Sequence, residues 1–202
     1  MYKIDKILIG THNKGKFKEI SDLLPKKVAK VSPNDLGLES PKENGKTFLE
    51  NSELKANFFC DKSKLVTLSD DSGLEIDILG KQPGIYSARW AGKKSNFDKA
   101  IERVYKQLNK KKVKWNKKIK CRFICALTIY WPNHKFYQSQ GIVEGTISNK
   151  PKGNNGFGYD PIFLIPEYGL HLAEMKKEDK NKSIQKRVNF SEINLRLINI
   201  NT

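Results

Sequence analysis

Apolar residues recur along this chain in two spacings, and they predict strands that alternate with helices. The clearest strand covers residues 119–129, where every second residue is apolar, and a turn at 131–133 leads into a predicted hairpin partner at 136–147. Other strands are predicted from short apolar runs, and helices from apolar residues three or four apart. These strands are 6–10, 28–31, 65–68, 74–78 and 162–165, and the helices are marked by Phe17–Leu24, Leu49–Phe59, Phe97–Leu108 and Phe190–Ile200.

This order of elements indicates the fold class. A hairpin among strands that are separated by helices implies a sheet with both parallel and antiparallel pairs. We therefore predict an α/β fold with a central mixed β-sheet, flanking helices, and two lobes with a substrate cleft between them. At 202 residues the chain can bury a sizeable core, and we expect residues 1–202 to form a single domain.

The net charge of +16 first suggests a polyanion as partner. The densest basic stretch, residues 109–118, has the pattern of an exposed loop, and lysine and asparagine are abundant along the whole chain. This spread favours a general surface bias over a dedicated nucleic-acid site. A small, highly charged anion is a further candidate, because surface charge steers such substrates electrostatically.

The cysteines, the N-terminal residues and the apolar runs together predict the cellular compartment. Cys60, Cys121 and Cys125 are odd in number, lie in apolar patterns and form no Cys-x-x-Cys pair, so we expect buried free thiols. No signal-peptide core is visible at the N-terminus, and no apolar run reaches membrane length. We therefore expect a cytoplasmic protein without a membrane segment.

Three polar segments carry the candidate chemistry, and the first follows the strand at 6–10. The turn Thr11-His12-Asn13-Lys14-Gly15-Lys16 leads directly into an amphipathic helix. Such a geometry presents backbone N–H groups and the positive end of a helix dipole to an anion, and the lysines add charge. The sequence lacks the Walker A pattern, and a lysine-rich helix start is the alternative interpretation.

The second segment is Ser69-Asp70-Asp71-Ser72-Gly73, at the end of the apolar run 65–68. Adjacent strand side chains point to opposite faces, so we expect Asp70 and Asp71 to have different functions. One carboxylate is expected to bind a divalent cation or act as a base, and Mg²⁺ is the cation that suits carboxylate and phosphate oxygens. A turn capped by its own aspartates is the alternative.

The third segment, Lys-Gly-Asn-Asn-Gly-Phe-Gly-Tyr-Asp at residues 152–160, has three glycines and two aromatic residues. Phe157 and Tyr159 have flat faces that can stack on a base, and Asp160 can accept hydrogen bonds from a base edge. A glycine-rich turn with incidental aromatics is the alternative. Histidine chemistry is disfavoured, because His12, His134 and His171 are dispersed and no Gly-x-Ser-x-Gly elbow occurs.

Taken in order, these segments resemble the inosine triphosphate pyrophosphatase family of house-cleaning nucleotide hydrolases. The likeness extends from the first strand to about residue 181. It is carried by Thr11-x-Asn13-x-x-Lys16, Thr47-Phe48-Leu49-Glu50-Asn51, Asp70–Leu74, Pro83–Arg89 and Gly156–Pro161. The resemblance implies hydrolysis of noncanonical purine nucleoside triphosphates (ITP, dITP and XTP) to the monophosphate and pyrophosphate. It also implies Mg²⁺ as cofactor and a cytosolic homodimer.

The resemblance also assigns roles to individual residues. It places the triphosphate at the turn 11–16, the metal at Glu43 and Asp71, and the catalytic function at Asp71. Water would attack the α-phosphorus with Asp71 positioning or deprotonating it, although the division between base and metal ligand stays open. The remaining substrate contacts that it implies are Lys55, Ser72, Phe157, Gly158, Tyr159, Asp160 and Lys180.

Two departures from the family pattern affect the substrate site. The family usually has glycine where this chain has His12. Its base-reading His-Arg pair is replaced either by Gln185-Lys186 or, with a one-residue insertion, by Lys186-Arg187. Lys186 and Arg187 thus become candidates for reading the 6-keto group of the purine.

Two other functions are disfavoured by the sequence. A Maf-like nucleotide pyrophosphatase with a different base preference is disfavoured by the Phe-Gly-Tyr-Asp loop. A nucleotide-binding or RNA-binding protein that has lost catalysis is disfavoured by the presence of Glu43 and Asp71.

Overall fold

The computed structural model describes residues 4–92, 95–115, 117–176 and 179. The described residues fall into two compact units. Unit 1 contains those up to Asp71 together with Cys125–Gly141, and unit 2 contains those of 72–124 and 142–184. The predicted single domain and the predicted cleft between two lobes stay predictions.

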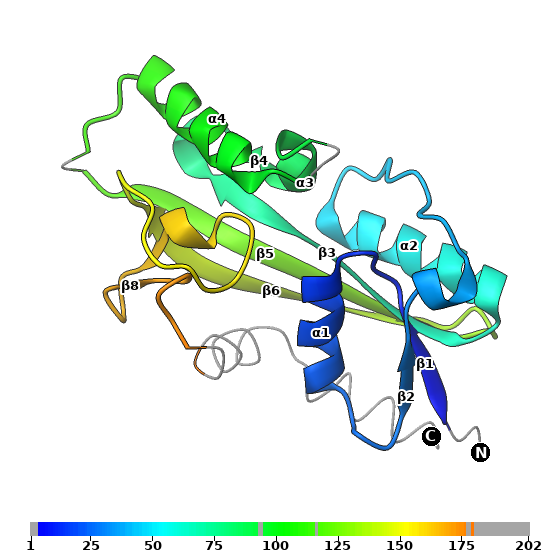
Figure 1. The fold of residues 1–202 in the computed structure, drawn as a ribbon. Helices are drawn as coiled ribbons and strands as arrows, with labels where there is room; N and C mark the ends of the chain where they lie inside the picture. Colours follow the sequence, from blue (N-terminus) through cyan, green and yellow to red (C-terminus); the bar gives the residue numbers. More distant parts are fainter. Residues whose placement is uncertain (1–3, 93–94, 116, 177–178, 180–202) are drawn as a thin grey trace. The chain divides into compact units, whose positions relative to one another are not determined.

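The described strands form one mixed sheet (Figure 1). Strand β1 is parallel to β2 and to β3, whereas β4 is antiparallel to β3, and β7 is antiparallel to both β6 and β8. The sheet and its helices confirm the predicted α/β class. In sheet order the strands are β2 (Ala29–Val31), β1 (Lys6–Ile9), β3 (Val66–Ile76), β5 (Ile119–Tyr130), β6 (Phe136–Ile147), β7 (Phe163–Ile165) and β8 (Leu170–His171), with β4 (Gln82–Pro83) beside β3.

Unit 1 is built from two strand–helix–strand crossovers. Helix α1 (Lys14–Leu23) connects β1 to β2, and η1 (Asn34–Leu36) and α2 (Phe48–Ser63) lie between β2 and β3. Both α-helices begin at a side-chain cap: Asn13 accepts from the N–H groups of Gly15 and Lys16, and Thr47 accepts from the N–H of Glu50. Parallel strands need such crossovers, because a tight turn joins only antiparallel neighbours.

Unit 2 holds its core between α4 (Phe97–Lys110) and the strands. The apolar stripe of α4, which ends at Leu108, packs on residues of β3, β5 and β7. Its start is capped by Asn96, whose side chain accepts from the N–H of Lys99. The other helices of this unit are η2 (Asp77–Leu79), η3 (Gly84–Tyr86), α3 (Ser87–Trp90) and η4 (Asp160–Ile162).

Most of the predicted elements are confirmed, and one prediction is wrong. We expected a strand end or a turn at 69–73, but β3 runs without a break from Val66 to Ile76. The polar residues in its middle are buried, and some find partners on neighbouring helices, so they do not end the strand. The predicted C-terminal helix lies outside the described residues.

The cysteines have the predicted environment. All three are free, Cys60 and Cys121 are buried, and Cys125 is half-buried. Burial raises the pKa of the Cys60 thiol to about 11 and that of Cys125 to about 12, so neither forms a nucleophilic thiolate readily near neutral pH. Among the described residues, no helix has the length and apolar character needed to span a membrane.

Candidate active site

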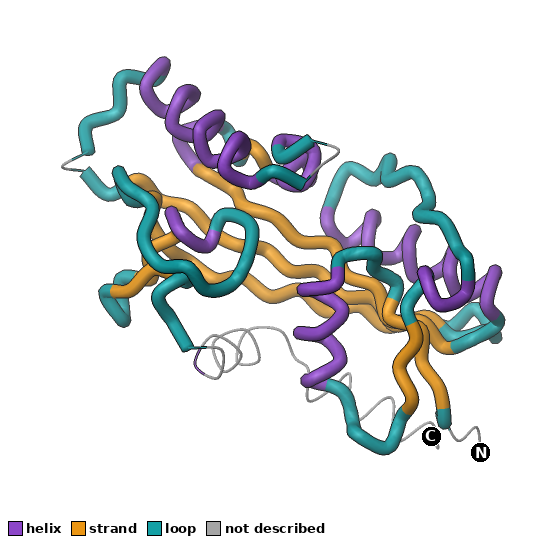
Figure 2. The backbone as a smooth tube through the Cα atoms, viewed as in Figure 1, coloured by secondary structure: helices purple, strands orange, loops and turns teal. Residues whose placement is uncertain are grey.

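The candidate site of unit 1 lies where β1 ends beside the middle of β3. Ile9 at the end of β1 pairs with Leu68 of β3, so β1 gives way to a turn where β3 continues through Ser69 and the two aspartates. Gly10 fits this close approach because a Cβ there would lie 2.1 Å from Ser69 Oγ. The carboxyl end of β1, which continues into a loop (Figure 2), is the kind of position where open α/β sheets bind their ligands.

Asp70 forms an ion pair with Lys16, the last residue of the turn at 11–16. Lys16 Nζ donates to Asp70 Oδ2 at 2.8 Å, and the Asp70 side chain is almost wholly buried. Burial opposes the charged form of Lys16, but the Asp70 carboxylate outweighs it and raises the pKa of the lysine. Lys16 is therefore a permanent cation with its Nζ held at the sheet edge.

Asp71 points to a different set of partners, as expected for neighbours on a strand. Asn51 Nδ2 of α2 donates to Asp71 Oδ2 at 3.1 Å. Burial raises the pKa of Asp71 from 3.8 to about 6, while Lys55 and Lys16 act in the opposite direction. A carboxylate poised near neutral pH suits a general base, so the expected difference between Asp70 and Asp71 is supported.

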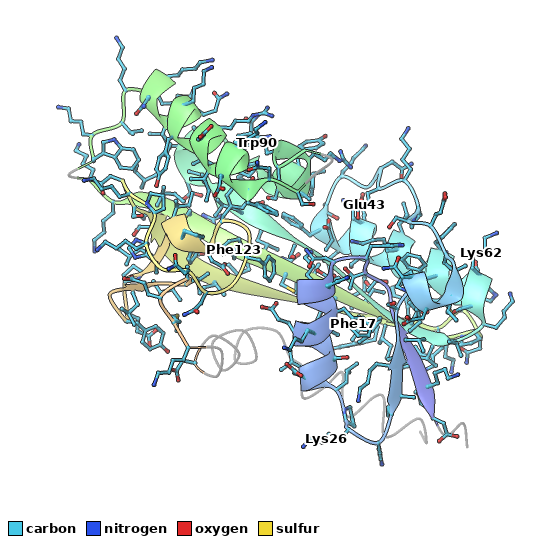
Figure 3. The ribbon with its side chains drawn as sticks, in the orientation of Figure 1. Phe17, Lys26, Glu43, Lys62, Trp90 and Phe123 are labelled. Carbon is cyan, nitrogen blue, oxygen red and sulfur yellow. The ribbon has the colours of Figure 1, made fainter. Side chains whose placement is uncertain are left out.

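Glu43 lies in the loop before α2 (Figure 3), where Lys55 Nζ contacts its Oε1 at 2.9 Å. Glu43 also raises the pKa of Asp71 through space, which places the two carboxylates in one electrostatic cluster. No group of three His, Cys, Asp or Glu side chains suited to a metal ion occurs in the described part of the chain. Two carboxylates nevertheless fit Mg²⁺, which typically takes one or two carboxylates and completes its shell with substrate phosphates and water.

The turn at 11–16 differs in part from the prediction. We expected free backbone N–H groups for an anion, but the N–H groups of Gly15 and Lys16 donate to Asn13 Oδ1, and that of Asn13 donates to Thr11 Oγ1. The cap therefore already occupies these donors. Positive charge from the lysines, Lys14 included, is what the turn offers a phosphate.

His12 lies against the loop that leads to Glu43. Its Nε2–H donates to the carbonyl of Leu38 at 2.9 Å, and the Ser40 hydroxyl donates to its Nδ1 at 2.8 Å, a tautomer assigned from these partners. Both ring nitrogens are thus engaged within the protein. We expected this ring to take part in the substrate turn. Its two hydrogen bonds instead connect the turn to the loop 38–40.

We expect His12→Ala to weaken metal use more than turnover. Loss of two exposed hydrogen bonds frees the loop that carries Glu43. At about 0.5–1.5 kcal/mol a bond, the two together correspond to about a 5–150-fold higher Mg²⁺ concentration at half-maximal activity. The value of kcat at saturating Mg²⁺ should change less than about 3-fold. Metal titrations of the rate measure this, with His134→Asn in the distant hairpin turn as control; an unchanged Mg²⁺ requirement contradicts the prediction.

The glycine-rich loop belongs to unit 2. Tyr159 is 2% exposed; its hydroxyl donates to the Ser87 carbonyl and its ring meets Phe97 edge-on. This burial argues against the stacking role predicted for Tyr159, whereas the Phe157 side chain is 36% exposed. Asp160 is also buried and accepts from the N–H of Phe157 at 2.9 Å, so its carboxylate shapes the loop.

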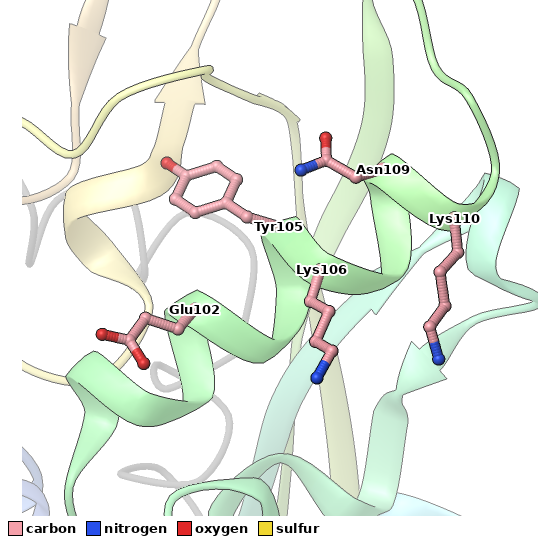
Figure 4. Close-up of a pocket in the computed structure, with 5 residues that line it drawn as sticks. All are labelled: Glu102, Tyr105, Lys106, Asn109 and Lys110. Atoms are coloured by element: carbon pink, nitrogen blue, oxygen red, sulfur yellow. The ribbon is translucent and has the colours of Figure 1, made fainter.

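Two further predicted residues lie in β3 and in the glycine-rich loop. Ser72 is half-buried in β3 directly after Asp71, and Gly158 has a φ of 71°, which favours glycine. Lys180, Lys186 and Arg187 lie outside the described residues. A hollow on the surface of α4 contains no predicted site residue (Figure 4); it is lined by Glu102, Tyr105, Lys106, Asn109 and Lys110.

Sequence reasoning missed one buried site residue, Asn51, and left Asp70 without a specific partner. Asn51 was present in the family motif Thr47–Asn51, and a polar residue on the buried face of a helix is a signal that it has a polar partner. The partner itself lies twenty residues away on β3 and has no local signature.

A family model described as the Ham1 family matches residues 7–192. The chain belongs to the Ham1 family. Among Ham1-like proteins of known structure, the HAM1 protein of Coxiella burnetii superimposes with a TM-score of 0.84 at 29% identity, covering 96% of this chain and 98% of that chain. The Staphylococcus aureus Ham1 protein does so with a TM-score of 0.79 at 31% identity, covering 96% of each chain.

Relatives of the chain carry an enzyme name. A dITP/XTP pyrophosphatase of Zymomonas mobilis is 42% identical over 183 residues, which is 90% of this chain and 86% of that protein. A dITP/XTP pyrophosphatase of Thermus thermophilus is 39% identical over 176 residues, 87% of this chain and 83% of that protein. Membership of the Ham1 family decides against the Maf-like alternative. Enzymes that cleave nucleoside triphosphates generally use a divalent metal ion.

Proposed function

We propose that this protein hydrolyses noncanonical purine nucleoside triphosphates, namely dITP, ITP and XTP, to the monophosphate and pyrophosphate. The observation that carries the proposal is the cluster formed by the turn after β1, the middle of β3, and α2 with the loop before it. There a buried carboxylate with a pKa of about 6 lies near two lysines and a second carboxylate. The relatives named dITP/XTP pyrophosphatase support the choice of substrate.

In this mechanism Asp71 takes a proton from the attacking water. Burial keeps its pKa high enough to accept that proton near neutral pH, and the amide of Asn51 holds one of its oxygens. Lys16 and Lys55 stabilise the negative charge that develops on the leaving pyrophosphate, which is where most of the barrier lowering in phosphoryl transfer arises.

Glu43 and Asp71 are the residues that we propose to hold Mg²⁺. When bound, the cation supplies further neutralisation of the phosphate oxygens and orients the substrate. Lys55 lies beside Glu43 in the metal-free protein, so it balances the charge of that carboxylate. Lys55 is thereby close to both the metal ligand and the phosphates.

The residues that read the base are proposed from the family resemblance alone. They are Lys186, Arg187 and the loop of Phe157, whose side chain is 36% exposed, while Lys180 is proposed as a further substrate contact. A lysine or arginine donor favours a 6-keto purine over adenine by about 1–3 kcal/mol, because an amino group offers no acceptor to it. The homodimer and the cytoplasmic location remain predictions of the same resemblance.

Product analysis tests the function. With dITP, ITP or XTP and Mg²⁺, we expect phosphorus NMR to show a nucleoside monophosphate and pyrophosphate in equal amounts, and no turnover with EDTA. The kcat/KM for ITP should exceed that for ATP by at least about 10-fold. A nucleoside diphosphate with orthophosphate as first products, or equal values for ITP and ATP, would contradict the proposal.

A further inference from the structure

Asn51 is a buried amide whose two ends have different partners. Its side chain is fully buried on α2. Its Oδ1 accepts from the N–H of Gly45 at 2.9 Å, and its Nδ2 donates to Asp71 Oδ2 at 3.1 Å. These partners fix which way the amide points, because only the oxygen can accept from an N–H and only the nitrogen can donate to a carboxylate.

The loop before α2 comes unusually close to this amide. A Cβ added at Gly45 would lie 2.6 Å from Asn51 Oδ1 and 2.9 Å from Glu50 Cβ, closer than real Cβ atoms come. A side chain at position 45 would therefore push the loop away and lengthen the bond to Asn51. This loop is the one that carries Glu43, two residues earlier.

We propose that Asn51 is a positioning residue that joins the two carboxylates of the site. One hydrogen bond orients Asp71, and the other holds the Glu43 loop at a fixed distance from it. The inference rests on the proposed function for its catalytic consequence, since it assumes that Asp71 is the base and Glu43 a metal ligand. Its structural content, one amide that bonds both to Asp71 and to the loop of Glu43, holds without any turnover.

Two variants separate the two bonds. Asn51→Ala removes both, whereas Asn51→Asp has almost the same shape, keeps an oxygen for the Gly45 N–H, and places a second carboxylate beside Asp71. We expect kcat to fall about 10–100-fold in both, the range seen when residues that orient a metal ligand are replaced. The KM for dITP should change less than about 3-fold, because neither bond goes to the substrate.

The metal requirement distinguishes positioning from general damage. The Mg²⁺ concentration at half-maximal activity should rise about 10–100-fold in Asn51→Ala, because the loop of Glu43 loses its bond to α2, and by less in Asn51→Asp, which keeps an acceptor for the Gly45 N–H. Ser52→Ala is the matched control: Ser52 is equally buried on α2, and its hydroxyl bonds to Leu49 and Thr128, not to Asp71. Its Mg²⁺ requirement should stay unchanged.

A measurement without substrate keeps this inference independent of the activity. Amide hydrogen exchange at Gly45 should be faster in Asn51→Ala than in the wild type, in Asn51→Asp and in Ser52→Ala, because only Asn51→Ala removes the acceptor of that N–H. If the wild type hydrolyses none of the nucleotides but this faster exchange is seen, the proposed function fails and the positioning inference stands. Unchanged exchange at Gly45 in Asn51→Ala, or equally fast exchange in Ser52→Ala, overturns it. If Asn51→Ala does not fold, Asn51→Leu, which keeps the volume and removes both bonds, decides in its place.

Discussion

Asp71→Asn is expected to lower kcat for dITP by about 10²–10⁴-fold while nucleotide binding persists. The substitution keeps the shape of the side chain but removes the group that takes the proton from water. The same change removes the charged Asp71 carboxylate, which burial in the folded protein makes less stable than it is in the unfolded chain. Because the pKa of Asp71 is raised from 3.8 to about 6, its ionisation lowers stability above about pH 6, and this penalty is absent below 3.8.

The variant should therefore lose activity without losing stability. At pH 7.5 we expect the free energy of unfolding to be unchanged or higher by about 1–3 kcal/mol, from the value of one pKa unit. Single-turnover rates and urea unfolding measure the two effects, with Asp61→Asn, an exposed aspartate at the end of α2, as control. Retention of more than about a tenth of wild-type turnover would show that another group is the base.

Lys16→Met is expected to have the largest effect on stability. It removes the cation that lies 2.8 Å from the buried Asp70 carboxylate. Loss of one partner of a buried ion pair costs about 3–5 kcal/mol, and since the Lys16 side chain is 21% exposed we expect about 2–4 kcal/mol. Turnover should fall as well, because Lys16 is a proposed phosphate contact.

A double-mutant cycle distinguishes the ion pair from lost packing. In a Lys16→Met background, Asp70→Asn removes the charge that had lost its partner, so the double variant should be more stable than Lys16→Met alone. Lys18→Met is the control: it changes an exposed lysine of the same helix and should stay within about 0.5 kcal/mol of wild type. Equal destabilisation by both lysine substitutions would contradict a special role for the pair.

The fold could be predicted from sequence where the pattern of a segment's own residues determines its secondary structure. The alternation at 119–129 gives β5 directly, and β6 has the bounds predicted for its hairpin partner. The break expected at 69–73 was wrong because a polar run is ambiguous in sequence. The pattern of aspartates and serines is typical of a turn, but these aspartates lie inside a strand because distant groups, Lys16 and Asn51, bond to their carboxylates.

The sequence predicted which residues form the site, but not how those residues contact one another. Motif spacing named Asp71 and Glu43, but it could not show that Asn51 bonds to one and to the loop of the other. The aromatic residues of the loop at 152–160 look equivalent in sequence. Only packing separates Tyr159, buried against Phe97, from Phe157, whose ring is exposed. Contacts between residues far apart in the chain carry all of these differences.

The pairing of Lys55 with Glu43 has a consequence for the order in which ligands arrive. In the described cluster three carboxylates, Glu43, Asp70 and Asp71, face only two ammonium groups, Lys16 and Lys55. A naked triphosphate brings up to four further negative charges into this excess. The complex of the nucleotide with its cation would enter at a smaller electrostatic cost, because the cation offsets part of the phosphate charge, and Glu43 would be one of the residues that hold it. We accordingly expect the chelated nucleotide, rather than the free one, to be the species that binds this site.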